Sequence, residues 1–280
     1  MVEKITPRHF VKAKREGKRI VMITAYDAIQ ARIVDEAGVD GILVGDSLGM
    51  VIMGYKSTVP VTLNMIIHHL KAVLNASPKA LIVADMPFLS YEVSKEEALR
   101  NAGKLIKLGA DAVKIEGGSE IIDIVEAMTR IGIPVMGHIG LNPQRYLIHG
   151  LRLRGSNAED AKKILEDAKA LEKAGVFSIV IEFTVSEVAA EITKNLRIPT
   201  ICIGSGPFCD GQILVFHDVV GLTTNPPPFA RRYVNASEIF GEAIKRYVRD
   251  VRENLFPSKE EYYTMDVKEY EKFKKMIGST

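Results

Sequence analysis

Residues 41–49 read Gly41-Ile42-Leu43-Val44-Gly45-Asp46-Ser47-Leu48-Gly49. The apolar start of this stretch stops abruptly at a glycine, a carboxylate and a hydroxyl. An apolar run of this length is typical of a strand buried on both faces of a parallel sheet. The stretch therefore predicts a buried strand with Asp46 and Ser47 at its carboxyl end.

Four more apolar runs end in the same way, each on one ionisable side chain. The residues at these ends are Asp85, Glu116, His138 and Glu182. Strand ends are often polar, but the carboxyl ends of parallel strands also meet at one edge of a sheet or one mouth of a barrel. Five such ends together predict a single site, in either an open α/β sheet or a (β/α)8 barrel.

Length and charge narrow the class of protein. The chain has 280 residues, and a single (β/α)8 barrel takes roughly 250. Its net charge is only +2 and it has no long basic block, which argues against a nucleic-acid surface. It has no apolar run of the roughly 18 residues that span a bilayer, and its start lacks the apolar core of a signal peptide. We therefore expect a cytoplasmic protein that binds neither nucleic acid nor membranes.

The two cysteines, Cys202 and Cys209, lie seven positions apart with no Cys-x-x-Cys pair or histidine cluster nearby. This pattern favours neither a zinc site nor a disulfide framework. We expect two ordinary buried thiols.

Caps and periodicity predict the elements around these strands. Thr6 and Pro7 begin a short amphipathic helix that is expected to cap the barrel bottom. The eighth strand, residues 212–217, follows the seventh so closely that the helix between them is expected to be missing. Ser237 caps a last long helix over residues 238–254. Residues 1–257 are assigned to the barrel domain, and 258–280 to a helical tail expected to serve as an oligomer contact.

The three carboxylates at neighbouring strand ends, Asp46, Asp85 and Glu116, are hard oxygen donors. Adjacent strands lie about 4.8 Å apart, so these side chains can converge on one cation. A set without sulfur or imidazole suits Mg²⁺ better than zinc. Such an ion would bind a bidentate oxo-acid, polarise its ketone and stabilise an enolate.

Four side chains have predicted roles beside this cation. Lys114 and Glu116 are two residues apart and share a strand face, so Lys114 can add positive charge beside an oxyanion. Ser47 can donate a hydrogen bond to a substrate carboxylate. Glu182, two strands away, is placed for a base rather than a ligand. His138 is assigned to the substrate site as an acid, a hydrogen-bond donor or a wall residue, and the sequence leaves these three open.

Five motifs together resemble the ketopantoate hydroxymethyltransferases in order and spacing, over about residues 6–257. They lie at residues 45–50, 84–88, 113–118, 137–144 and 210–215. The resemblance implies a (β/α)8 barrel that transfers a hydroxymethyl group from 5,10-methylenetetrahydrofolate to 3-methyl-2-oxobutanoate. The product would be 2-dehydropantoate, for pantothenate and coenzyme A biosynthesis. It also implies a ring-like homo-oligomer, typically a decamer, and the apolar residues 51–55 fit a lid or a subunit contact.

The resemblance also implies roles for single residues. The family's metal ligands fall on Asp46, Asp85 and Glu116, its substrate contacts on Asp46, Ser47, Asp85 and Lys114, and its proposed base on Glu182. Two segments depart from the family pattern. Residues 183–185 read Phe-Thr-Val where Cys-Val-Pro is frequent, and residues 204–206 read Gly-Ser-Gly where Gly-Ala-Gly is usual. Both touch the expected pocket lining rather than the reacting groups.

Two other functions fit parts of the pattern. Barrels of the phosphoenolpyruvate mutase and isocitrate lyase type also use Mg²⁺, carboxylates and an oxo-acid enolate, but the Lys-Lys-Cys-Gly-His type of loop expected of the lyases is missing here. A non-catalytic oligomeric module that binds an oxo-acid is the other alternative. The presence of Lys114 and Glu182 beside the acidic set argues against it.

Overall fold

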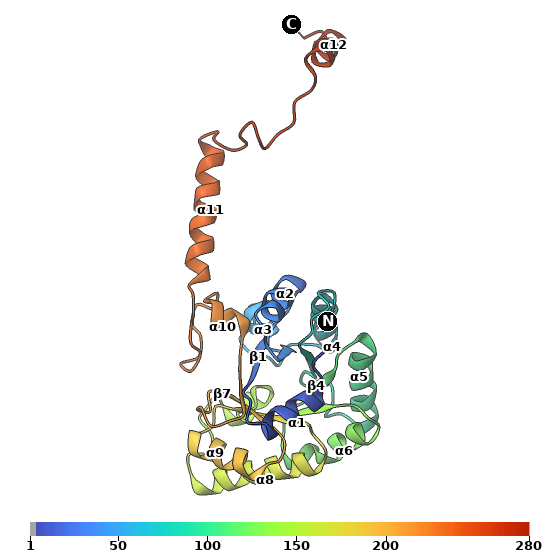
Figure 1. Cartoon of the computed structure of the whole chain (residues 1–280), viewed down its shortest axis with the longest axis vertical. Coiled ribbons are helices and arrows are strands. Elements are labelled where there is room, and N and C mark those ends of the chain that lie inside the picture. Colours follow the sequence, from blue (N-terminus) through green and yellow to red (C-terminus); the bar gives the residue numbers. More distant parts are fainter. Residues whose placement is uncertain (1–3, 280) are drawn as a thin grey trace. The chain divides into compact units, whose positions relative to one another are not determined.

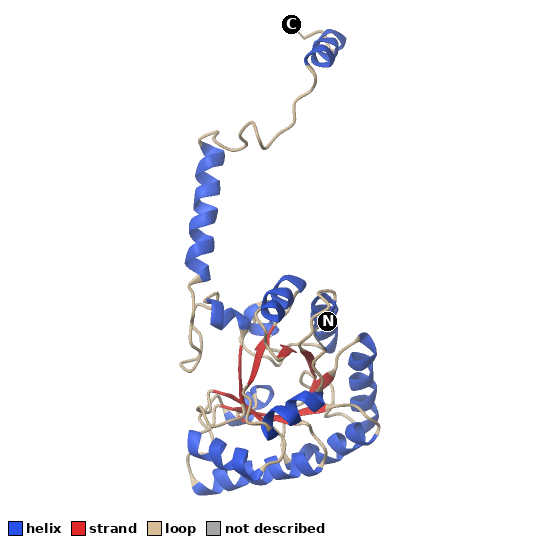
Figure 2. Ribbon diagram, in the orientation of Figure 1, coloured by secondary structure: helices blue, strands red, loops and turns tan. Residues whose placement is uncertain are grey.

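The computed structural model describes residues 4–279 and contains a closed barrel of eight parallel strands in sequence order. Figures 1 and 2 show the strands as an inner ring with helices around it. This architecture confirms the predicted (β/α)8 class. The strands are β1 (Ile20–Thr24), β2 (Gly41–Val44), β3 (Leu81–Asp85), β4 (Ala112–Lys114), β5 (Val135–Gly140), β6 (Ser178–Glu182), β7 (Thr200–Ile203) and β8 (Gly211–Leu214).

Four of the longer outer helices begin at a capping side chain. Asp27, Thr62, Ser94 and Asn157 each accept a hydrogen bond from the backbone N–H three residues later, which satisfies a donor that the helix leaves free. The outer helices are α2 (Ala28–Glu36), α3 (Leu48–Val51), α4 (Leu63–Leu74), α5 (Lys95–Leu108), α6 (Ile122–Arg130), α7 (Tyr146–His149), α8 (Ala158–Lys173), α9 (Ser186–Asn195) and α10 (Phe216–Val220), with short 3₁₀ turns at Ser119–Ile121 and Pro143–Arg145.

The barrel core has two layers because strand side chains alternate in direction. On β3, Leu81 and Val83 belong to the apolar cluster inside the barrel, whereas Ile82 and Ala84 pack against the outer helices. On β4 the inner residue Ala112 is followed two positions later by Lys114. Because every second side chain of a strand points inward, the ionisable side chains at the strand ends also point into the barrel mouth. The apolar side chains that precede them on the strands fill the barrel below.

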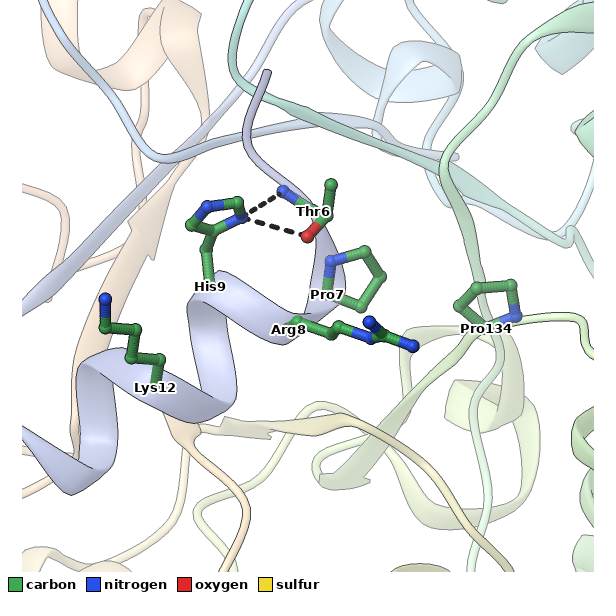
Figure 3. Close-up of a pocket in the computed structure, with 6 residues that line it drawn as sticks. All are labelled: Thr6, Pro7, Arg8, His9, Lys12 and Pro134. Atoms are coloured by element: carbon green, nitrogen blue, oxygen red, sulfur yellow. Dashed lines mark hydrogen bonds between the residues drawn. The ribbon is translucent and has the colours of Figure 1, made fainter. Parts of the chain in front are cut away.

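Helix α1 (Pro7–Arg15) closes the amino-terminal end of the barrel, as predicted. Phe10 is 1% exposed and belongs to the cluster inside the barrel, with its ring 6.0 Å from that of Phe177. The first turn is held by Thr6, whose N–H donates to His9 Nδ1 at 3.0 Å. A hollow of about 600 Å³ lies beside this turn and is also lined by Pro134. Figure 3 shows its lining residues. Pro134 directly precedes β5, so this hollow lies at the opposite end of the barrel from the predicted site.

The loop between β7 and β8 confirms one prediction and corrects another. No helix lies within the described residues 204–210, as predicted. The predicted free thiols are wrong, because Cys202 and Cys209 form a disulfide, with Cα atoms 5.7 Å apart. The tight loop turns back through Gly204 and Gly206, both at positive φ, and so brings together two residues whose spacing alone gives no sign of a bond.

Strand β8 is shorter than predicted. It ends at Leu214, and residues 216–217 begin α10 instead of continuing the strand to residue 217. The Phe216 N–H donates to the Thr24 hydroxyl at 2.9 Å, so a side chain of β1 takes the bond that a further strand residue would give to the sheet. This competition cannot be read from the apolar run itself.

Contacts divide the chain into two units, one ending at Tyr233 and one beginning at Val234. The second unit contains α11 (Ala236–Arg252) and α12 (Val267–Met276). Helix α11 begins two residues before the predicted start, with Asn235 rather than Ser237 at its N-cap. The predicted domain boundary at residue 257 stays a prediction. No helix among residues 4–279 is both long and apolar enough to cross a lipid bilayer.

Candidate active site

The predicted site residues lie together at the carboxyl ends of β2 to β6. Asp85 and Glu182 are the last residues of β3 and β6, and His138 lies within β5. Five of the ionisable side chains are nearly removed from water, at 5% exposure or less: Asp46, Asp85, Lys114, Glu116 and His138. The Glu182 side chain keeps 17% exposure. A buried charged group of this kind is tolerated when it is paired or works as a unit with others.

Lys114 is the positive centre of the group. Its Nζ lies 2.8 Å from Asp85 Oδ1 and 3.4 Å from Glu116 Oε1. Asp85 is also the direct strand neighbour of Lys114 in the sheet. Burial alone lowers the pKa of Lys114, but the charges of Asp85, Glu116 and Asp46 outweigh it and raise that pKa well above its usual value. Lys114 is therefore a permanent ammonium group here, and not a base.

Asp46 shows that the site holds more negative charge than Lys114 neutralises. Its pKa is raised well above the usual value, first by burial and then by the nearby charges of Asp85 and Glu116. Lys114 and a hydrogen bond from Gln144 act in the opposite direction. A further cation would favour the ionised form of Asp46.

The carboxylates fit a hard cation by donor type, since three oxygen ligands without sulfur suit Mg²⁺. In the arrangement seen, their charge is taken up by Lys114 and by hydrogen bonds. No group of three or more His, Cys, Asp or Glu side chains within residues 4–279 is spaced to hold a metal ion as it stands. A metal would therefore need small side-chain adjustments around Lys114.

His138 lies between the acidic group and Glu182. Its Nε2 is 3.3 Å from Glu182 Oε2 and its Nδ1 is 3.4 Å from Glu116 Oε1. Nε2 also lies 2.9 Å from the Leu141 carbonyl oxygen. Because that oxygen can only accept, we assign the proton to Nε2, which leaves Nδ1 buried without a hydrogen-bond partner. The imidazole thus connects the predicted base to the acidic set.

Ser47 has a partner that the sequence interpretation missed. The Ser47 Oγ lies 2.8 Å from the hydroxyl of Tyr26, a residue that is 1% exposed and lies two positions after the end of β1. Burial raises the pKa of Tyr26, so its hydroxyl stays protonated. The signal was available, because Tyr26 follows an apolar run just as the predicted site residues do.

Gln144 and Tyr91 are two more site residues that sequence reasoning did not find. Gln144 Nε2 donates to Asp46 Oδ2 at 2.8 Å, and the Gln144 N–H donates to Glu116 Oε2 at 3.1 Å. The Tyr91 hydroxyl lies 2.9 Å from Gln144 Oε1. Gln144 closes one of the recognised motifs, whereas no pattern singles out Tyr91 on its loop after β3.

The two segments that depart from the family pattern lie against each other. The Thr184 N–H donates to Ser205 Oγ at 3.0 Å, and this hydroxyl donates in turn to the Ile181 carbonyl at 2.8 Å. Ser205 is 1% exposed. Its hydroxyl fastens the loop after β7 to the end of β6, next to Glu182.

The fold and the buried acidic mouth define a (β/α)8-barrel enzyme whose site lies at the carboxyl ends of its strands. Residues 4–259 match the sequence profile of the ketopantoate hydroxymethyltransferase family, so the chain belongs to that family and is a hydroxymethyltransferase. It is 58% identical to the 3-methyl-2-oxobutanoate hydroxymethyltransferase of Staphylothermus marinus over 272 residues, which cover 97% of this chain and 100% of the relative. The protein of the same name from Caldivirga maquilingensis is 60% identical over 260 residues, 92% of this chain and 98% of the relative.

Solved structures support the fold. A 2,3-dimethylmalate lyase of the PEP mutase/isocitrate lyase superfamily matches with a TM-score of 0.58 and 18% identity, over 99% of this chain and 100% of the other. A phosphonopyruvate hydrolase matches with a TM-score of 0.62 and 13% identity, over 99% and 98%. At this sequence identity, the structural similarity supports the barrel fold but says nothing about the reaction that this protein catalyses.

Proposed function

We propose that this protein transfers a hydroxymethyl group from 5,10-methylenetetrahydrofolate to 3-methyl-2-oxobutanoate, giving 2-dehydropantoate for pantothenate and coenzyme A biosynthesis. The buried group of Asp46, Asp85 and Glu116 around Lys114 carries this proposal, in a chain that closely matches proteins named for the oxo-acid. Such a group suits an oxo-acid whose carbonyl oxygen gains negative charge during reaction.

Asp46, Asp85 and Glu116 are the residues proposed to hold Mg²⁺. When bound, the ion supplies Lewis-acid polarisation of the oxo-acid ketone and stabilises its enolate form. Three close carboxylates with one ammonium group are short of positive charge, which supports this assignment. Burial and then the charges of Asp85 and Glu116 raise the pKa of Asp46 accordingly.

Lys114 and Ser47 are proposed to bind and orient the oxo-acid. The ammonium group of Lys114 provides positive charge where the carbonyl oxygen becomes negative. Tyr26 stays protonated, so its hydroxyl can donate to Ser47 Oγ and leave the Ser47 hydroxyl hydrogen for the substrate carboxylate.

Glu182 is proposed to remove the C3 proton of the oxo-acid. Asp85 and Glu116 are paired with Lys114, whereas Glu182 is the more exposed carboxylate of the mouth. Its Oε2 lies 3.3 Å from His138 Nε2, so the imidazole borders the carboxylate on one side. His138 is therefore assigned to positioning Glu182 beside the substrate.

Hydrogen exchange at C3 tests the proposed function directly. Proton NMR of 3-methyl-2-oxobutanoate in D₂O should show loss of the C3 proton signal when the enzyme and Mg²⁺ are both present. When the metal is chelated, the C3 proton signal should decay as slowly as in a control without enzyme. When methylenetetrahydrofolate is added to the enzyme with Mg²⁺, the oxo-acid should be converted to 2-dehydropantoate. A protein that binds the oxo-acid without exchange would be a binding module, which contradicts the proposal.

We also propose that the enzyme works as a homo-oligomer, with a decamer as the expected form. Helix α11 supports this proposal, because several of its large apolar side chains are exposed, including Ile239, Phe240, Ile244 and Tyr247. Apolar surface of this extent marks a protein contact. Exposed Met50 and Met53, in and beside α3, form further apolar surface. The cytoplasmic location expected from the sequence stays a prediction.

Light scattering should give a particle many times heavier than the 30.9 kDa chain. Ile244→Asp should reduce this mass, because a buried, unpaired carboxylate destabilises an apolar contact. Lys245→Asp on the same helix is the matched control, since the Lys245 side chain is 75% exposed and should leave the mass unchanged. A wild-type particle of 30.9 kDa at micromolar concentration would refute the assembly.

A further inference from the structure

We propose that Gln144, oriented by Tyr91, selects which single oxygen of Asp46 and of Glu116 faces the cation and thereby tunes the site for Mg²⁺ over larger ions. This inference rests on the proposed Mg²⁺ site and assigns its selectivity to a residue that holds ligands without being one.

Gln144 reaches both carboxylates through two different groups. It is 2% exposed, its side-chain Nε2 donates to Asp46 Oδ2 at 2.8 Å, and its backbone N–H donates to Glu116 Oε2 at 3.1 Å. Nε2 also donates to the Met86 carbonyl at 3.1 Å. Both neighbours of Nε2 are acceptors, so the amide must point its NH₂ group at them and its Oε1 away.

Tyr91 holds the other end of this amide. Its fully buried hydroxyl lies 2.9 Å from Gln144 Oε1 and 2.9 Å from the Glu116 carbonyl, and it accepts from the Glu116 N–H at 3.1 Å. The hydroxyl has one proton for these two oxygens and also accepts from the Glu116 N–H, so it links the Gln144 side chain to the backbone at Glu116. A buried network in which each member has a partner is rigid.

The hydrogen bonds divide the oxygens of the three carboxylates into two sets. Asp46 Oδ2 and Glu116 Oε2 are occupied by Gln144, and Asp85 Oδ2 accepts the Asp46 N–H at 3.1 Å. Asp85 Oδ1 and Glu116 Oε1 face the positive Lys114 Nζ instead. Each carboxylate thus has one oxygen held by a neutral donor, and in Asp85 and Glu116 the other oxygen faces positive charge. In Asp46 the oxygen that Gln144 leaves free is Oδ1.

One oxygen from each carboxylate is a pattern that discriminates between ions. Mg²⁺ is small, takes six ligands in near-ideal octahedral geometry and keeps several waters, whereas Ca²⁺ takes six to eight oxygens and accepts bidentate carboxylates. If Asp46 Oδ2 is released from Gln144, the affinity of the site for Mg²⁺ should fall more than its affinity for Ca²⁺. Gln144 is accordingly a positioning residue for metal selectivity.

Titration calorimetry of the full-length protein with MgCl₂ and CaCl₂ tests this role. Gln144→Met keeps the side-chain length and removes the amide donor. Loss of a group that orients a ligand typically costs about 10–100-fold in metal affinity, so we expect a fall of this size for Mg²⁺ and a smaller one for Ca²⁺. Tyr91→Phe should lower the Mg²⁺ to Ca²⁺ affinity ratio in the same direction, because it frees Gln144 Oε1. Gln212→Met is the matched control, since this exposed glutamine of β8 donates to the Gly206 carbonyl instead.

The outcomes separate this inference from the proposed function. The inference is overturned if Gln144→Met binds Mg²⁺ with the Mg²⁺ to Ca²⁺ affinity ratio of the wild-type protein. If circular dichroism shows that Gln144→Met does not fold, the same result in Tyr91→Phe overturns it. Either result leaves the proposed function standing. A wild-type protein that catalyses C3 exchange without binding Mg²⁺ refutes the metal site, and the inference with it. A Mg²⁺ to Ca²⁺ affinity ratio that is about tenfold lower in the folded variants than in the wild type supports the inference.

Discussion

Glu182→Gln should abolish C3 exchange and hydroxymethyl transfer while Mg²⁺ and oxo-acid binding persist. A positioned base contributes on the order of 10²–10⁴ in rate, and we expect a loss of this size. The other carboxylates of the mouth are paired with Lys114 or held by Gln144, and Lys114 is a permanent cation. Glu182 therefore carries the available lone pair nearest the exposed side of the site. The NMR exchange rate in D₂O and calorimetry with the oxo-acid measure the two halves of this prediction.

Glu191→Gln provides a matched control on the next helix. Glu191 is an exposed residue of α9 whose partner is Lys194, so its loss should leave exchange at the wild-type rate. Near-normal exchange in Glu182→Gln would instead assign the proton removal to another group. His138, whose Nε2 contacts Glu182 Oε2, would then be the first to replace.

Asp85→Asn should weaken Mg²⁺ binding by at least about 100-fold, beyond the roughly 10–100-fold typical of residues that only support a ligand. The change removes one of three negative charges and leaves a side chain of the same size. The barrel should stay folded, because Glu116 remains paired with Lys114 and the amide oxygen can still accept the Asp46 N–H. Activity should fall with the affinity for the ion.

Calorimetry with MgCl₂ and thermal unfolding measure these two effects separately. Asp123→Asn is the control, because Asp123 is an exposed residue of α6 that is paired with Lys95 and not with the buried acidic group. Should the Mg²⁺ affinity of Asp85→Asn equal that of the wild type, Asp85 does not hold the ion. The proposed ligand set would then reduce to Asp46 and Glu116.

The local sequence pattern determined the strands and the helix caps of this protein. The apolar runs at residues 41–44 and 81–84 became β2 and most of β3, since a strand buried on both faces needs apolar side chains throughout. Lys114 and Glu116 share one face because side chains alternate along a strand, and their 3.4 Å contact follows from that spacing. The caps at Ser94 and Thr62 acted within one helical turn. Strand-end side chains could be predicted as one site because barrel topology brings all such ends to one mouth.

Only the closed barrel decided how those side chains are held. Gln144 and Asp46 are 98 positions apart, and Tyr91 and Gln144 are 53 apart, yet each pair is hydrogen-bonded. The Cys202–Cys209 bond depends in the same way on a tight turn of the loop after β7. The two hydrogen bonds of Gln144 form between loops of different strands, whose approach depends on strand register and barrel closure rather than on the residues nearby in sequence. The carboxylates and the lysine of the mouth could therefore be predicted from the sequence alone. Which oxygen of each carboxylate accepts a hydrogen bond from a neighbouring residue is determined only by the tertiary structure.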